Sequence, residues 1–124
     1  MHGRLDRALC AACGHRWPAP LEMRVGELCP KCDAGAGRPD VVWFGEVPHG
    51  LDEIDRALSA ADLFAAIGTS GEVYPAAGFV EMARAVGART VELNLAPGRP
   101  GRFDEVRQGP ATETLPAWVA ELVR

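Results

Sequence analysis

Short apolar runs alternate with amphipathic stretches along most of the chain. Residues 40–45 form an apolar run typical of a strand that is covered on both faces, residues 63–67 suggest a second buried strand, and residues 90–95 a third strand. Between them, Leu51 to Ala60 and Pro75 to Val86 carry apolar residues at helical spacing. The order strand, helix, strand, helix, strand is typical of parallel βαβ units.

Segments without this periodicity are expected to be irregular. We expect residues 1–9 to be a lead-in, and residues 96–109, which are rich in Pro and Gly, to form a loop. Thr114 can cap a last helix and Pro116 can start it. Because three parallel strands are few, the pattern predicts an α/β fold: one half of a doubly wound, Rossmann-like parallel sheet.

The four cysteines form two close pairs that change this picture. Two residues separate Cys10 from Cys13 and Cys29 from Cys32, and fifteen residues lie between the pairs. Each pair can place two thiolates on one side of a tight turn, and two facing turns supply the four sulfur ligands that structural Zn²⁺ prefers. We therefore expect an inserted four-cysteine zinc ribbon over residues 10–37, with no catalytic role for the metal.

Two other readings of the cysteines fit less well. Disulfides are disfavoured because the N-terminal residues have no apolar stretch of the signal-peptide type, which predicts a cytoplasmic location with reduced thiols. A thioredoxin-like redox motif needs one such pair opening a helix, not two pairs on a ribbon.

Composition excludes several classes of partner. The chain has 124 residues and a net charge of −4, without a basic stripe that would offset nucleic-acid phosphates, so we expect no nucleic-acid partner. We also expect no membrane partner, because no apolar run approaches the roughly 20 residues that span a bilayer.

The motifs together resemble the sirtuins, the NAD-dependent protein-lysine deacylases, and in particular the bacterial and mitochondrial-type members. Their order and spacing match from one end of the chain to the other. The matching motifs are His2-Gly3, the four cysteines, Val41-Val-Trp-Phe-Gly-Glu46, Gly68-Thr-Ser70, Val73-Tyr-Pro-Ala-Ala77, Asn94-Leu95 and Gly109-Pro-Ala111.

The resemblance implies a reaction and a catalytic residue. Sirtuins transfer the acyl group of an acylated lysine to NAD⁺, giving nicotinamide, O-acyl-ADP-ribose and free lysine. His2 matches their general base, and an imidazole with a pKa near 6.5 suits proton transfer at neutral pH. Without the resemblance, His2 is a lone residue at a chain terminus.

The resemblance also implies binding residues for NAD and for the acylated protein. Small residues after a strand let backbone N–H groups approach a phosphate or ribose at the carboxyl edge of the sheet, although the same residues also suit an ordinary turn. The implied NAD-binding residues are Gly68, Thr69, Ser70, Asn94, Leu95 and Ala111. An extended acyl-lysine peptide would add as a strand beside two segments. The implied substrate-binding residues are Val42, Trp43, Phe44, Gly45, Glu46 and Val73.

The Gly-rich phosphate-binding turn with which sirtuins begin is not in this sequence. We therefore expect the C-terminal half of a sirtuin, with a partial Rossmann-like domain at residues 1–9 and 38–124 and the ribbon between them. We expect this chain by itself to be inactive. The alternative is a zinc-stabilised binding module that derives from a truncated sirtuin and has lost catalysis.

Overall fold

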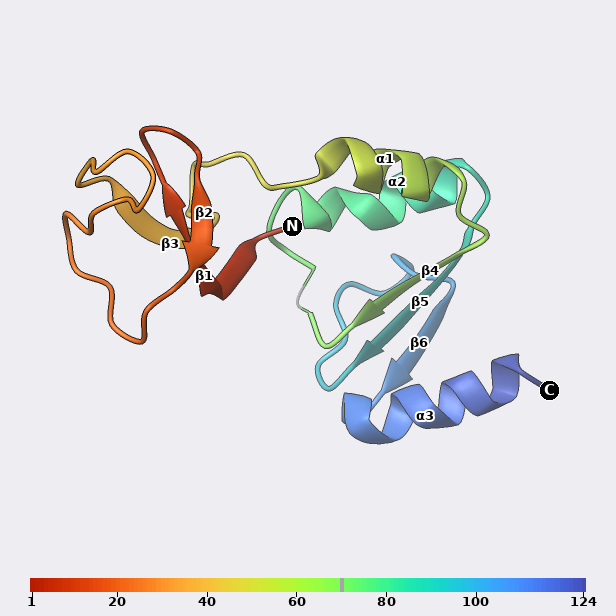
Figure 1. Cartoon of the computed structure of the whole chain (residues 1–124). Coiled ribbons are helices and arrows are strands. Elements are labelled where there is room, and N and C mark those ends of the chain that lie inside the picture. The colour runs from red at the N-terminus through yellow and green to blue at the C-terminus, as the bar shows by residue number, and fades with distance from the viewer. Residues whose placement is uncertain (70) are drawn as a thin grey trace. The chain divides into compact units, whose positions relative to one another are not determined.

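The computed structural model describes residues 1–69 and 71–124, which divide into two compact units, Met1–Leu51 and Asp52–Arg124 (Figure 1). Each unit has its own sheet. No helix in the described residues is long and apolar enough to cross a membrane.

The first unit is a small antiparallel sheet with long loops. Its strands are β1 (Gly3–Cys10), β2 (Arg16–Pro18) and β3 (Gly37–Val41), in the order β2-β1-β3. The prediction of an irregular lead-in before Cys10 was wrong, because β1 occupies most of it. Its polar residues carry no alternating pattern, since most of them are exposed and only Ala8 and Cys10 are buried.

The strand predicted at residues 40–45 is also shifted. β3 ends at Val41 and pairs with β1 in antiparallel fashion, so it is not the first strand of a parallel sheet. The apolar residues that follow it suggested a buried strand. Trp43 and Phe44 are instead exposed, 54% and 96% respectively.

The second unit is an α/β layer structure around a parallel sheet. Its elements are α1 (Leu51–Ser59), β4 (Leu63–Ile67), the 3₁₀ turn η1 (Ala76–Gly78), α2 (Phe79–Ala85), β5 (Arg89–Asn94), β6 (Glu105–Gln108) and α3 (Ala111–Leu122). The strands β4, β5 and β6 lie side by side in that order, all parallel (Figure 1). The predicted α/β fold with a parallel sheet is confirmed, as are two of its strands, β4 and β5, but the third strand is β6 and not the predicted residues 40–45.

Two apolar clusters hold the helices on opposite faces of this sheet. Leu58 of α1 and Ala83 of α2 pack with Phe64 of β4 on one face. Trp118 of α3 packs against Val91 and Leu93 of β5 on the other. β5 is covered on both faces: Thr90, Val91, Glu92 and Leu93 are all buried, although only Val91 and Leu93 are apolar.

Two boundaries differ from the sequence-based expectation. β6 lies in the segment that was predicted to be a loop. The sequence did not reveal this strand because it has no buried apolar residue: Glu105 and Arg107 are half-buried, and the residues after each are exposed. α3 begins at Ala111, after an extended Pro110, and Pro116 lies inside it. Thr114 donates its hydroxyl to the Pro110 carbonyl oxygen from within the helix, so the prediction that it caps the helix was wrong.

Candidate functional site

The four cysteine sulfurs of the first unit meet in one cluster. All four Sγ atoms lie within 4.8 Å of one another, and the Cys10–Cys32 and Cys13–Cys29 pairs are each 3.7 Å apart. A disulfide needs about 2.05 Å, so these thiols are not bonded. Four ligands at the usual Zn–S distance of about 2.3 Å around a tetrahedral ion lie about 3.8 Å apart, so the cluster fits zinc.

The same backbone turn is used twice to build this cluster. Gly14 donates its N–H to the Cys10 carbonyl oxygen, and Asp33 donates its N–H to that of Cys29, each at 2.9 Å. Both Gly14 and Asp33 have a positive φ, of 72° and 54°, which lets the chain reverse after the second cysteine of each pair. The first cysteine of each pair is buried and the second is exposed.

The thiols have unequal acidity. The backbone N–H of Cys13 is the main cause that lowers the pKa of the Cys10 thiol to about 7. The pKa of the Cys32 thiol rises to about 12: the backbone N–H of Ala34 opposes the rise, but hydrogen bonds with Cys13 and burial outweigh it. Four thiolates this close repel one another, so a bound cation is what allows all four to ionise.

His2 lies in the same unit, at the start of β1. Its ring is exposed, and its carbonyl oxygen accepts the N–H of Val42 at 2.9 Å. Gly3 follows with φ of 82°, and a Cβ at that position would overlap the carbonyl oxygen of Asp40. Only glycine therefore fits after His2, which fixes the backbone on which the imidazole stands.

Val42 to Glu46, expected to be extended, instead leads into a tight turn. Glu46 donates its N–H to the Trp43 carbonyl oxygen at 3.0 Å, and Gly45 has φ of 87° at the third position, as in a type II turn. The Glu46 carboxylate accepts the Trp43 N–H at 3.0 Å and the Arg38 Nη2 at 2.8 Å. Whether these residues bind substrate stays a prediction.

Arg38 gives this turn its electrostatic character. Its guanidinium carbon lies 3.9 Å from the centroid of the Trp43 ring, a cation–π contact. Its hydrogen bonds to Glu46, with the Trp43 N–H as second cause, lower the pKa of that carboxyl to about 2. These contacts of Arg38 and Glu46 hold the turn, and Phe44 within it is exposed.

In the second unit, predicted NAD-binding residues meet at the carboxyl edge of the parallel sheet. Gly68 follows β4 with φ of 62° and donates its N–H to the Leu93 carbonyl oxygen at 2.9 Å. Asn94, which ends β5, donates its amide to the Thr69 carbonyl oxygen at 2.7 Å. Ser70 lies outside the described residues. This edge is where open α/β sheets bind ligands.

The other residues predicted for this unit lie on the following loops. Gly109 donates its N–H to the Asn94 carbonyl oxygen at 3.1 Å, which brings the start of α3, with Ala111 as its first residue, beside the end of β5. The Leu95 side chain is exposed, and its carbonyl oxygen accepts the Gln108 amide at 3.3 Å. Val73 is exposed before η1, and its carbonyl oxygen accepts the Ala77 N–H at 2.9 Å.

Sequence reasoning missed a buried acid at this edge. Glu92 is 3% exposed, and its Oε1 accepts the Asn94 amide at 3.2 Å and the Gly98 N–H at 3.0 Å. Both amide hydrogens of Asn94 are thus directed at acceptors, which leaves its Oδ1 to accept from a ligand. An acid between the apolar residues Val91 and Leu93 of a predicted strand was the signal that could have revealed Glu92.

Comparisons with known proteins agree with this geometry. The Sir2 family profile matches residues 1–75. The NAD-dependent protein deacylase of Caulobacter vibrioides is 53% identical over 126 residues, covering 99% of this chain and 52% of that protein. The chain thus spans about half the length of the curated relatives it matches.

Solved structures have the same fold. A Sir2 homologue–NAD complex is similar with a TM-score of 0.83 and 30% identity, over 97% of this chain and 48% of that one. A Sir2–p53 peptide–NAD⁺ complex is similar with a TM-score of 0.81 and 26% identity, over 97% of this chain and 53% of that one.

Proposed function

Because the chain belongs to the Sir2 family, we propose that it forms the C-terminal half of an NAD-dependent protein-lysine deacylase. One observation carries the proposal: the turn after β4, the Asn94 amide and the start of α3 lie at the carboxyl edge of the parallel sheet. The deacylase names and NAD complexes of its relatives support NAD as the second substrate.

The proposed reaction converts acyl-lysine, NAD⁺ and water to lysine, nicotinamide and O-acyl-ADP-ribose. The acyl oxygen attacks C1′ of the nicotinamide ribose, and nicotinamide leaves. The His2 imidazole then accepts a proton from a ribose hydroxyl, which attacks the acyl carbon. The local backbone supports this role, because Gly3 permits close approach to Asp40 and the Val42 N–H donates to the His2 carbonyl oxygen.

For NAD, the residues of the second unit have distinct proposed tasks. Gly68 and Thr69 leave β4 without bulky side chains, which gives a phosphate or ribose access to the backbone. Asn94 presents its Oδ1 to a ribose hydroxyl, since its amide hydrogens are taken by Thr69 and Glu92. Ser70, Leu95 and Ala111 stay predicted neighbours of the same ligand.

The proposed protein substrate is an extended peptide that carries an acylated lysine. Trp43 and Phe44 in the first unit have exposed apolar side chains, which suit contact with a peptide or the acyl-lysine stem. Val73 in the second unit is exposed and apolar as well. Main-chain pairing beside these segments would give weak sequence preference. The Sir2–p53 peptide–NAD⁺ complex supports a peptide as substrate.

We also propose that one Zn²⁺ is bound by Cys10, Cys13, Cys29 and Cys32. With four thiolate ligands, the ion is coordinatively closed and stabilises the ribbon without taking part in the reaction. Reduced, unbonded thiols are compatible with the cytoplasmic location predicted above.

A chimera tests the function. The chain replaces the matching half of its Caulobacter relative, and the chimeric enzyme is given an acetylated peptide with or without NAD⁺. We expect nicotinamide and O-acetyl-ADP-ribose in equal amounts, seen by mass spectrometry, and none without NAD⁺. The chain by itself should release no nicotinamide above background, because half of the site cannot hold both reactants in the geometry that the reaction needs. A chimera that binds peptide and NAD⁺ without turnover would favour the alternative, a binding module that lost catalysis.

A further inference from the structure

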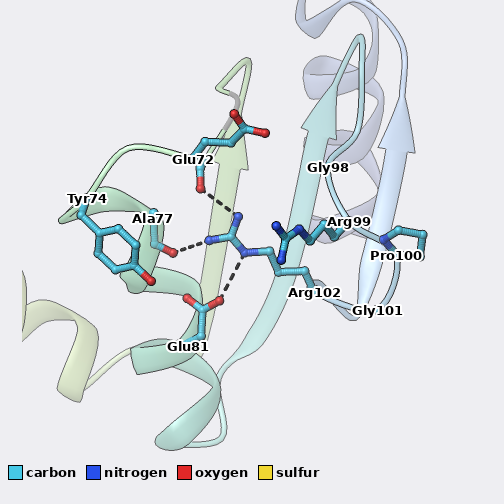
Figure 2. Close-up of a pocket in the computed structure, with 10 residues that line it drawn as sticks. Glu72, Tyr74, Ala77, Glu81, Gly98, Arg99, Pro100, Gly101 and Arg102 are labelled. Atoms are coloured by element: carbon cyan, nitrogen blue, oxygen red, sulfur yellow. Dashed lines mark hydrogen bonds and ion pairs between the residues drawn. The ribbon is translucent and has the colours of Figure 1, made fainter.

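A pocket of about 670 Å³ in the second unit separates the segment 71–77 from the loop 98–102. The side chain of Arg102 crosses this space, and Figure 2 shows its guanidinium directed at Glu81 and Ala77. The two segments have different predicted tasks. Residues 71–77 include Val73, a predicted peptide contact that does not itself line the pocket, and residues 98–102 follow Asn94 and Leu95, which are predicted to contact NAD.

Arg102 uses all three of its side-chain nitrogens across the pocket. Its Nη1 donates to the Gly71 carbonyl oxygen at 2.8 Å, its Nη2 donates to the Ala77 carbonyl oxygen, and its Nε pairs with Glu81 at 3.3 Å. The side chain is only 21% exposed. A planar guanidinium can satisfy three acceptors in fixed directions, which a lysine cannot do.

Helix α2 fixes the same loop from the other side. Arg84 donates from Nη1 to the carbonyl oxygens of Gly101 and Arg102, each at 3.1 Å. Glu81 and Arg84 lie one turn apart on α2, so the helix holds both the backbone and the side chain at position 102. The loop 98–102 is therefore fixed to α2, and from it the Arg102 side chain extends to the segment 71–77.

A second hydrogen bond holds the chain just before residue 71. Asn94 donates its amide to the Thr69 carbonyl oxygen at 2.7 Å, two residues before the carbonyl that Arg102 holds. Gly71 itself has φ of 61°, and a Cβ there would lie 3.2 Å from the Arg102 Nη1. The end of β5 and the loop that follows it therefore each hydrogen-bond to the segment after β4, through Asn94 and Arg102 respectively.

We propose that Arg102 is a positioning residue for the deacylation reaction. It ties the peptide-side segment 71–77 to the NAD-side loop, so that the backbone at Val73 is held where an acyl-lysine peptide can pair with it. This inference rests on the proposed function, but the tie itself is a property of the chain.

Hydrogen exchange on the chain tests the tie without any activity. Arg102→Met should speed exchange of the Ala77 and Gly78 amides about tenfold, since hydrogen bonds to a charged group are lost. Arg99→Met is the matched control, because the Arg99 side chain forms no hydrogen bond or ion pair within the described part of the chain, and it should leave these amides unchanged. Wild-type exchange in Arg102→Met would overturn the tie.

A second variant separates positioning from general stability. Arg102→Lys keeps the charge, but all its donors are on one nitrogen, so it cannot reach the three acceptors that Nε, Nη1 and Nη2 contact. Ala77 and Gly78 should therefore exchange faster while the β5 amides stay protected. Equal acceleration of the β5 amides in both variants would overturn the proposal, because Arg102 would then only stabilise the fold.

Kinetics of the chimeric enzyme test the use of the tie. Arg102→Met should raise KM for the acetylated peptide about tenfold, with a much smaller change in kcat and no change for Arg99→Met. An unchanged peptide KM would overturn the positioning role. A chimera that shows no turnover even with Arg102 intact would contradict the proposed function instead. Hydrogen exchange would then still show whether Arg102 holds the segment 71–77.

Discussion

Glu92 holds two separate groups at the carboxyl edge of the sheet with one buried carboxylate. It accepts from the Asn94 amide and from the Gly98 N–H. Glu92→Ala leaves two donors without acceptors in a buried place, so we expect a loss of about 1–3 kcal/mol in the free energy of unfolding. Chemical denaturation measures this, with Glu92→Gln as the control that keeps one acceptor. Equal stability of the alanine variant would contradict the assigned contacts.

Glu46 makes the turn at residues 43–46 sensitive to acid. Its hydrogen bonds with Arg38 and the Trp43 N–H lower its pKa in the folded chain to about 2, below the usual value of about 4.3. A lowered folded pKa means that the stabilisation is complete above about 4.3 and is lost as the pH falls from there through about 2. NMR titration of the Glu46 carboxyl in wild type and in Arg38→Met measures this. We expect the pKa to rise toward its usual value in the variant, although the Trp43 N–H still lowers it, and an unchanged pKa would rule out Arg38 as the main cause.

The zinc ribbon is the element whose stability depends most on one ligand set. Among the described residues before residue 52, the buried apolar ones are Ala8, Cys10 and Cys29, and Asp40 is the one buried charged group. A unit with so little core needs its metal, because site binding and folding are one event in small zinc modules.

Metal removal should therefore affect the two units differently. On chelation or in Cys29→Ser, we expect the amide signals of residues 1–51 to collapse in NMR spectra, while β4, β5 and α3 keep theirs, since they have separate apolar clusters. His15→Ala is the matched control, because His15 lies beside Cys13 but is not one of the four ligands. Loss of both sets of signals, or of neither, would contradict this.

Helix α3 is held by one large side chain. Trp118 is 5% exposed and packs against Val91 and Leu93. We expect Trp118→Ala to cost about 3–5 kcal/mol in unfolding free energy, because the cavity cannot fully collapse. The neighbouring Val119 is 43% exposed, so Val119→Ala should cost about 0.5 kcal/mol or less. Thermal or chemical unfolding compares them, and similar costs would show that α3 is not held through Trp118.

The sequence predicts an element or a site residue well where a local pattern reveals it, and poorly where contacts with distant residues determine it. The strand at residues 63–67 is clear because it is a short uninterrupted apolar run, and the helix from Leu51 because its apolar residues recur at helical spacing. β1 and β6 were missed because each owes its place to neighbouring strands and not to an apolar face of its own. The four cysteines were readable because metal ligation needs fixed spacing, whereas Glu92 and Arg102 act through contacts with residues distant in sequence.

In the proposed function, His2 is the general base of the deacylation reaction. The most direct test is nicotinamide release from NAD⁺ and an acetylated peptide by the chimeric enzyme, compared between wild type, His2→Ala and the control His15→Ala. We expect His2→Ala to lower turnover about 10²–10⁴-fold, as the loss of a general base does, while zinc content and thermal stability stay as in wild type. His15→Ala should turn over normally. Wild-type turnover of His2→Ala would contradict the central claim.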